Sequence, residues 1–206
     1  MINMVITDIQ KRKRLLNALY IDGEYAVDID REILLINHVK VGLELNDEDL
    51  YKLISKSNNK RAKDRALYCL SRRDYSKKEL ADKLKKVFGD DASLYAVDKM
   101  EDLGLMNDER FAEKYAHDLM LIKKYSPQRA LRELLKKGID KYISEEVINN
   151  LSPNIHDQIY NLVERKYQKY LIDEKGKRRT VQALMRLGYK WEDIRPVINE
   201  FLNQDY

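Results

Sequence analysis

The amino-acid sequence predicts a mainly α-helical protein, in which a tandem array of three three-helix repeats follows a small antiparallel β-rich domain. The first observation is a stretch made of a turn or cap, a basic amphipathic helix and a glycine, which recurs at residues 75–89, 125–138 and 175–188. The second is its register, because a spacing of 50 residues aligns apolar positions in every copy: Leu84, Leu134 and Leu184, and also Val97, Val147 and Val197. A repeat of this length with helical content is typical of a tandem helical array.

The third observation concerns the first part of the chain, where short β-compatible runs replace the helical pattern. A basic link, Lys11-Arg12-Lys13-Arg14, joins the runs at 5–9 and 15–21, and Asp22-Gly23 separates the second run from 24–29. A two-residue Asp-Gly loop between such runs is a strong hairpin signal, because a type I′ turn needs positive φ at both positions. An antiparallel sheet of about three strands is therefore expected.

Two helical segments complete this first domain. Residues 31–39 form an ambiguous apolar run that is compatible with a short helix, and Asn46 is an expected N-cap for a helix that ends at about residue 55. The polar stretch 56–60 is then expected to break the pattern and separate the domains. The predicted division is residues 1–58 for the β-rich domain, and residues 59–107, 108–153 and 154–206 for the three repeats.

Each repeat is expected to contain three helices that begin at capping residues and end at glycines. Ser76 opens a capping box with Glu79. Ser126 precedes Pro127, and a proline costs no hydrogen bond at the first helical position, because the N–H there has no partner within the helix. The expected helices cover about residues 60–73, 77–88, 92–103, 108–123, 127–137, 140–151, 154–171, 175–187 and 191–202.

The same pattern gives expectations for packing. In the first helix of repeat one, Ala66, Leu67 and Leu70 are expected to point inward. In its third helix, Leu94, Val97 and Met100 are expected to share one face. Trp191 is expected to be a packing anchor, and Pro196 to kink the last helix or delay its start. Most of the 14 tyrosines are expected in the core or half-buried, and not as platforms for nucleic-acid bases.

Composition indicates a soluble chain with a strongly charged surface. Of its 206 residues, 36% are charged, and the mean hydropathy is −0.64. No apolar run approaches the roughly 20 residues of a membrane span, and residues 1–10 lack the layout of a signal peptide. The lone Cys69 excludes an intramolecular disulfide and suits a reducing compartment, so a cytoplasmic location is expected.

Charge is distributed unevenly along the chain. The formal net charge is +4; residues 1–58 contribute −2, and residues 158–206 contribute +3. The excess is too mild for a protein that packages DNA, which must neutralise many phosphates. It fits a partner that is mixed in charge, or negative on one side.

No catalytic or metal-binding constellation is apparent in the sequence. His38, His117 and His156 are scattered, and neither another histidine nor Cys69 stands at a spacing suited to a metal. Paired acids near expected helix starts are explained by the helix dipole, and no glycine-rich phosphate loop occurs. We therefore expect neither an enzyme nor a cofactor.

Basic residues on the second helix of each repeat, and beside it, are the candidate contacts for a partner or for DNA. Two interpretations stay open: a solvated face balanced by interspersed acids, or a row of positive charge that follows a phosphate backbone or an acidic protein groove. Sequence-specific base readout is not favoured, because only Gln128-Arg129 offers suitable side chains in an opening turn. The candidates are Arg72, Arg73, Lys77, Lys78, Arg129, Arg132, Lys136, Lys137, Lys177, Arg178, Arg179 and Arg186.

Two stretches carry a family resemblance. Residues 70–80 read Leu-Ser-Arg-Arg-Asp-Tyr-Ser-Lys-Lys-Glu-Leu, and residues 103–112 read Leu-Gly-Leu-Met-Asn-Asp-Glu-Arg-Phe-Ala. Both resemble signatures of the RecX regulators of the RecA recombinase, and residues 132–139 resemble the signature of that family's second repeat. The chain departs from the pattern at Ser126, where the family often has glycine, and at Leu105, where an aromatic residue is usual.

The resemblance implies a non-enzymatic modulator that lodges in the helical groove of the RecA–DNA filament. Such a protein is expected to suppress ATP hydrolysis, strand exchange and the coprotease activity behind the SOS response, and to act as a monomer with weak DNA binding of its own. Two alternatives stay open on the residues alone: a helical-repeat module that binds nucleic acid directly, and a scaffold for another protein.

Overall fold

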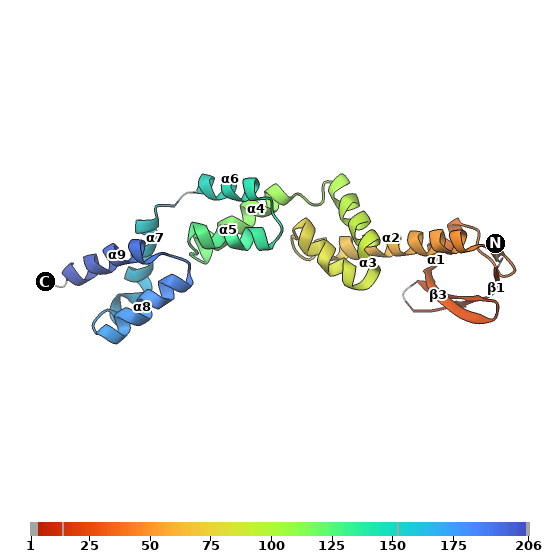
Figure 1. Ribbon diagram of the computed structural model, residues 1–206, viewed down its shortest axis with the longest axis horizontal. Coiled ribbons are helices and arrows are strands. Elements are labelled where there is room, and N and C mark those ends of the chain that lie inside the picture. The colour runs from red at the N-terminus through yellow and green to blue at the C-terminus, as the bar shows by residue number, and fades with distance from the viewer. Residues whose placement is uncertain (1–3, 14, 152, 205–206) are drawn as a thin grey trace. The chain divides into compact units, whose positions relative to one another are not determined.

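The computed structural model describes residues 4–13, 15–151 and 153–204 and divides the chain into two compact units, Met1–Asn107 and Asp108–Tyr206. The first unit contains the sheet and repeat one, and the second contains repeats two and three (Figure 1). The predicted mainly helical fold, with three-helix repeats behind a small antiparallel sheet, is confirmed.

The sheet contains the three expected strands and a fourth that the sequence did not reveal. Strands β1 (Met4–Lys11), β2 (Leu16–Ile21), β3 (Glu24–Asp30) and β4 (Glu44–Leu45) lie in the order β3-β2-β1-β4, with antiparallel pairing throughout. Asp22 and Gly23 have φ values of 52° and 89°, which is the backbone of the predicted turn. Strand β4 was missed because two residues are too few to show an alternating pattern.

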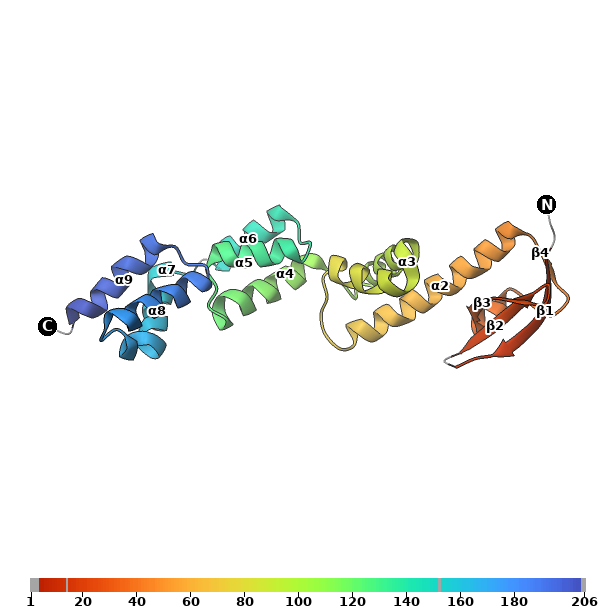
Figure 2. The same cartoon turned by 60° about the horizontal axis from the view of Figure 1, so that its bottom comes forward.

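One face of the sheet packs on helix α1 (Arg31–Ile36) and on the first half of helix α2 (Asp47–Leu70), and Figure 2 shows α2 beside the strands. The short helix at the ambiguous run 31–39 is therefore present. The core between these elements is made of aliphatic side chains that are almost fully buried, among them Ile6, Leu19, Ile29, Leu34 and Leu53.

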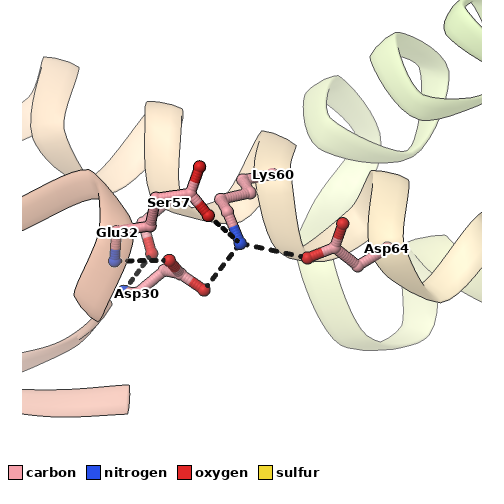
Figure 3. Close-up of polar contacts among 5 residues, drawn as sticks. All are labelled: Asp30, Glu32, Ser57, Lys60 and Asp64. Carbon is pink, nitrogen blue, oxygen red and sulfur yellow. Dashed lines mark hydrogen bonds and ion pairs between the residues drawn. The ribbon is translucent and has the colours of Figure 1, made fainter. Parts of the chain in front are cut away.

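Helix α2 corrects one expectation, because it runs without interruption through residues 56–60, where a break was predicted. The polar residues of this stretch face polar groups of the sheet domain. The buried hydroxyl of Ser57 accepts a hydrogen bond from the Asp30 backbone N–H over 2.9 Å, and the Lys60 ammonium lies 3.3 Å from the Asp30 carboxylate (Figure 3). The polar stretch is thus a tertiary contact inside a helix.

The rest of repeat one follows the expected plan with two errors in packing. Helix α3 (Lys77–Asp102) is capped by Ser76 and broken in the middle by Gly89 (φ 80°), so its halves correspond to the two predicted helices. Leu67 is 40% exposed, although it was expected to face inward, and Leu94 is 55% exposed, whereas Val97 and Met100, which were expected on its face, are buried. Small residues take those places: Ala62, Ala66, Ala92 and Ala96 are buried, and they let the helices approach closely.

The second unit contains repeats two and three. Repeat two comprises α4 (Asp108–His117), the π-helical turn η1 (Asp118–Ile122), α5 (Pro127–Lys136) and α6 (Lys141–Leu151). Repeat three comprises α7 (Ile155–Leu162), the π-helical turn η2 (Val163–Tyr167), the 3₁₀ turn η3 (Gln168–Tyr170), α8 (Glu174–Arg186) and α9 (Trp191–Gln204). The π turns were not predicted, because a single widened turn leaves the apolar pattern almost unchanged.

One expectation about the last helix is narrowed and one needs correction. Helix α9 begins at Trp191 and contains Pro196 in its interior, so of the two effects expected of this proline the delayed start is absent. Trp191 is 50% exposed and is not a core anchor; Tyr189, which is 3% exposed, has that position. None of the helices in the described ranges combines the length and apolarity needed to cross a membrane.

Candidate functional site

The candidate basic residues of repeat one are largely engaged within their own unit. Arg72 lies over the Tyr68 ring, 5.6 Å from its centroid, and Arg73 lies 3.6 Å from the centroid of Tyr75. Ion pairs join Arg73 to Glu79 (3.4 Å), Lys77 to Glu101 (2.5 Å) and Lys78 to Asp82 (2.8 Å). The hydrogen bond from Lys78 also lowers the pKa of Asp82 below its usual value. In this repeat the structure therefore favours the interpretation as a balanced, solvated face.

Repeats two and three instead bring candidate cations together. Arg129, Arg132 and Lys136 of α5 line one side of a groove of about 270 Å³, and Arg186 at the end of α8 lines the other. Glu133, Met185 and Gly188 complete the lining. We call this feature the basic groove. Its single acid, Glu133, is paired with Lys136 over 2.9 Å, so three arginines are left to attract an anion.

A set of hydrogen bonds between the two repeats fixes the walls of the basic groove. The Ser126 backbone N–H donates to the Leu187 carbonyl over 2.9 Å, and the Ser126 hydroxyl donates to the Gly188 carbonyl over 2.8 Å. The same hydroxyl oxygen accepts from the Arg129 N–H over 3.3 Å, as expected of the N-cap of α5. The cap of one repeat is therefore also the docking point for the helix end of the next.

Further contacts hold the same junction. The Tyr189 hydroxyl donates to the Lys124 carbonyl over 3.0 Å, and burial raises the pKa of this phenol well above its ordinary value. On the other side, the buried Gln158 side chain donates to the Met120 carbonyl over 2.5 Å. Met120 lies near the end of the π turn η1, and the last carbonyls of a helical segment have no partner within it.

Gly188 allows the close approach of α8 to α5. Its φ of 96° is unfavourable for other residues, and a Cβ atom there would lie 2.6 Å from both the Arg129 Cβ and the Ser126 Oγ. Arg129 itself is half-buried and stacks on Tyr125, 3.8 Å from the ring centroid. Its guanidinium is thus held in place before any ligand arrives.

The remaining candidates lie outside the basic groove. Lys137 lies beside Tyr115, 5.6 Å from the ring centroid. Lys177 is paired with Glu174 over 2.9 Å, and this hydrogen bond lowers the pKa of Glu174. Arg178 and Arg179 are exposed at the start of α8, and within the described ranges neither forms an ion pair.

Sequence reasoning missed one residue that belongs with these cations. At the spacing of 50 residues, Lys86 aligns with Lys136 and Arg186, and within the second helices this is the position where every copy carries a cation. Lys86 is exposed on α3. The register of the repeat could have identified it, whereas a search for local clusters of charge did not.

The arrangement is suited to binding an anion. Rigid arginines that are paired with few acids recognise phosphate or carboxylate groups. Among the described residues, no group of three or more histidine, cysteine, aspartate or glutamate side chains could hold a metal ion.

The fold and the basic groove define a tandem three-helix-repeat protein with a small N-terminal sheet. Models of the first, second and third three-helix domains of RecX match residues 62–100, 107–148 and 155–198. The chain belongs to the RecX family.

Curated relatives match over nearly the whole chain. "Regulatory protein RecX" of Caldanaerobacter subterraneus subsp. tengcongensis is 32% identical, covering 95% of this chain and 99% of its own. The protein of the same name from Clostridioides difficile is 27% identical, covering 98% and 97%. Each of these relatives is named a regulatory protein.

Solved structures agree with the fold. The crystal structure of a regulatory protein RecX matches 95% of this chain and 99% of its own, with a TM-score of 0.63 and 18% identity. The crystal structure of RecX from Lactobacillus salivarius matches 70% of this chain and 96% of its own, with a TM-score of 0.58 and 26% identity.

Proposed function

We propose that this protein is a regulator without a reaction of its own, which binds the RecA–DNA filament along its helical groove. On binding, it lowers RecA's ATP hydrolysis, strand exchange and coprotease activity. Membership of the RecX family supports the choice of partner. It acts as a monomer in the cytoplasm, which is where RecA filaments form.

The basic groove is the observation that carries this proposal. It joins cations from two repeats in one rigid surface, whereas the cations of repeat one are paired with acids. A filament of protein and DNA offers both carboxylates and phosphates, and arginine forks bind either group with two hydrogen bonds. We therefore assign the docking contact to Arg129, Arg132, Lys136 and Arg186, with the other candidate cations as a weaker periphery.

The test uses RecA's DNA-dependent ATPase and co-sedimentation with RecA filaments. The full-length protein is expected to slow ATP hydrolysis and to sediment with the filaments. The double variant Arg132→Gln/Arg186→Gln is expected to lose both effects by at least about tenfold in the concentration required, since two charge-assisted contacts disappear. A matched control, Lys141→Gln/Lys190→Gln, removes two exposed cations of the same unit, one at the start of α6 and one directly before α9, and is expected to act as wild type.

Two results would reject the proposal. One is a wild-type protein that neither slows the ATPase nor sediments with filaments. The other is a groove variant that performs as well as its control, which would move the contact away from the basic groove.

Direct binding of nucleic acid is the second candidate function. Arg178, Arg179 and Arg186 on α8 favour it, because within the described residues none of them is paired with an acid. The expected signature is affinity for bare DNA that falls steeply with salt and falls further when Lys177, Arg178 and Arg179 are replaced by glutamine. Millimolar or weaker binding at physiological salt would remove this candidate.

A further inference from the structure

The segment between α7 and α8 is held firmly against the first turn of α8. Leu171 is buried in the core of repeat three, and the Asp173 carboxylate accepts the Gly176 N–H over 2.6 Å. The Tyr170 carbonyl lies directly on Gly176, where a Cβ atom would stand 1.8 Å from the oxygen. The side chains that flank Leu171 are therefore presented by a rigid backbone.

Those flanking side chains point into solvent. Tyr170 is 49% exposed and Ile172 is 91% exposed. Together with Lys169, Lys175 and Arg179 they line a hollow of about 270 Å³, which we call the terminal patch. Most of the fourteen tyrosines of the chain were expected in the core or half-buried, and Tyr170 is among those that are exposed. It is an open aromatic ring among cations.

Two acids next to the terminal patch, Asp173 and Glu174, are already engaged. Asp173 accepts the N–H of Gly176, and Glu174 pairs with Lys177 over 2.9 Å. Lys169 lies 5.1 Å from the centroid of the Tyr170 ring, while Lys175 and Arg179 form no ion pair within the part of the chain that the structure describes. A neighbouring hollow of about 710 Å³ adds Arg165 and Lys166, with one acid, Glu164. The patch is therefore positive, with cations available to a ligand.

The terminal patch also connects with the basic groove along one helix. Arg179 and Arg186 are seven residues apart on α8, so they lie on the same face, separated by about 10 Å along the helix axis. A flexible polyanion can follow this face from the groove to Tyr170. A ligand with charge alone would gain nothing from the exposed ring at the end of that path.

We propose that the terminal patch binds single-stranded nucleic acid, with Tyr170 as the platform on which a base stacks and with Lys169, Lys175 and Arg179 contacting the phosphates. A single strand has free base faces, which stack on aromatic rings without regard to sequence, whereas a duplex keeps its bases stacked inside. This inference extends the proposed function by naming a nucleic-acid contact that the regulator makes beside its contact with the filament protein.

The experiment measures binding of fluorescein-labelled (dT)20 to the full-length protein by fluorescence anisotropy at low salt. Tyr170→Ala is expected to weaken binding by about 5- to 100-fold, and Tyr170→Phe to restore it, because stacking needs the ring and not the hydroxyl. Tyr142→Ala, which removes a tyrosine that is 74% exposed on α6, is the matched control and is expected to bind as wild type. A labelled duplex of equal length should bind Tyr170→Ala and wild type alike.

Salt dependence tests the phosphate contacts. The slope of log affinity against log salt is expected to fall by about 0.7 for each of Lys169, Lys175 and Arg179 that is changed to glutamine. The inference is overturned if wild type does not bind (dT)20, if Tyr170→Ala binds it as Tyr142→Ala does, or if single-strand and duplex binding fall together. It is also overturned if Tyr170→Ala weakens only co-sedimentation with filaments, which would make the patch a protein contact. Failure of the proposed function is a separate result: a wild-type protein that binds (dT)20 but leaves the RecA ATPase unchanged.

Discussion

The hydroxyl of Ser126 donates a hydrogen bond over 2.8 Å to the carbonyl oxygen of Gly188, 62 residues further along the chain. One side chain thereby caps the helix of repeat two and holds the end of the corresponding helix of repeat three. The stability of the second unit and the shape of the basic groove depend on the same few atoms.

Ser126→Ala is expected to lower the free energy of unfolding of the second unit by about 2 kcal/mol, because it removes an N-cap and leaves a carbonyl without its donor. Urea unfolding followed by the fluorescence of Trp191, the one tryptophan of the chain, measures this unit. Ser144→Ala is the matched control, since its buried hydroxyl bonds to the Asp140 carbonyl, which also accepts the Ser144 N–H. Equal losses in the two variants would refute the special position of Ser126.

Gly188→Ala is expected to cost more than about 2 kcal/mol, because a methyl group must fit where Arg129 and Ser126 already lie and the backbone has positive φ. Gly188→Asn separates the two causes. Asparagine tolerates positive φ but has the same Cβ atom, so it should destabilise the second unit nearly as much as alanine. Recovery in the asparagine variant would show that backbone strain alone is responsible.

Thr180→Val is expected to raise the stability of the second unit by about 1 kcal/mol. The Thr180 hydroxyl is buried in repeat three and finds no hydrogen-bond partner among the described residues, and the equivalent residues of the other copies, Leu80 and Ala130, are apolar. A buried hydroxyl without a partner is unfavourable, and valine has nearly the same shape. Thr180→Ser keeps the hydroxyl and loses the methyl group, so its unfolding midpoint should fall; a fall in both variants would contradict the explanation.

Lys60→Met is expected to lower the free energy of opening of the first unit by about 3 kcal/mol. This change is measured as faster hydrogen exchange of the Asp30 amide. Burial disfavours the charge on Lys60, but hydrogen bonds to Asp64, Glu32 and Asp30 outweigh it and raise its pKa. Removing the cation leaves the Asp30 carboxylate, which is 4% exposed, without its ion pair. Lys52→Met, which breaks only an exposed pair with Glu48, should leave this exchange unchanged.

A small pH dependence is expected at the contact between α7 and α9. The hydrogen bond to Glu200 (2.8 Å) raises the pKa of His156. Stabilisation by this pair is therefore complete below the ordinary histidine pKa and is lost as pH rises through the raised value. Both side chains are 44% exposed, so the effect should not exceed about 0.5 kcal/mol. The wild-type protein is expected to be slightly more stable at pH 5.5 than at pH 8.5, and His156→Gln should remove this difference. If the variant keeps the difference, other titrating groups cause it.

The repeats, their caps and their glycine stops could be predicted because they are local signals repeated at a fixed spacing. Ser76 and Ser126 were both expected as caps and are caps in the structure. The unbroken course of α2 could not be predicted, because the partner of Ser57 is Asp30, 27 residues earlier in a strand. A polar stretch with distant partners looks like a linker until those partners are known.

The candidate site was predictable in composition but not in arrangement. The sequence left open whether the twelve cations form a balanced face or a row. In the described part of the chain, those of repeat one are paired with acids such as Glu101 and Asp82, whereas repeats two and three bring several together. The basic groove arises from the docking of the Gly188 turn on α5, which no local pattern encodes. Tyr170 was not singled out from the sequence. The position of a tyrosine along the chain does not show whether its own side chain or that of the adjacent residue is buried.

The continuity of α2 gives the sheet domain a mechanical property. A helix of 24 residues is about 36 Å long, and this one is clamped to the sheet at Lys60 and built into repeat one at Ala66. Because the helix is unbroken between these two contacts, a force applied to the strands is transmitted to repeat one. Any ligand that tilts the sheet therefore also reorients that repeat.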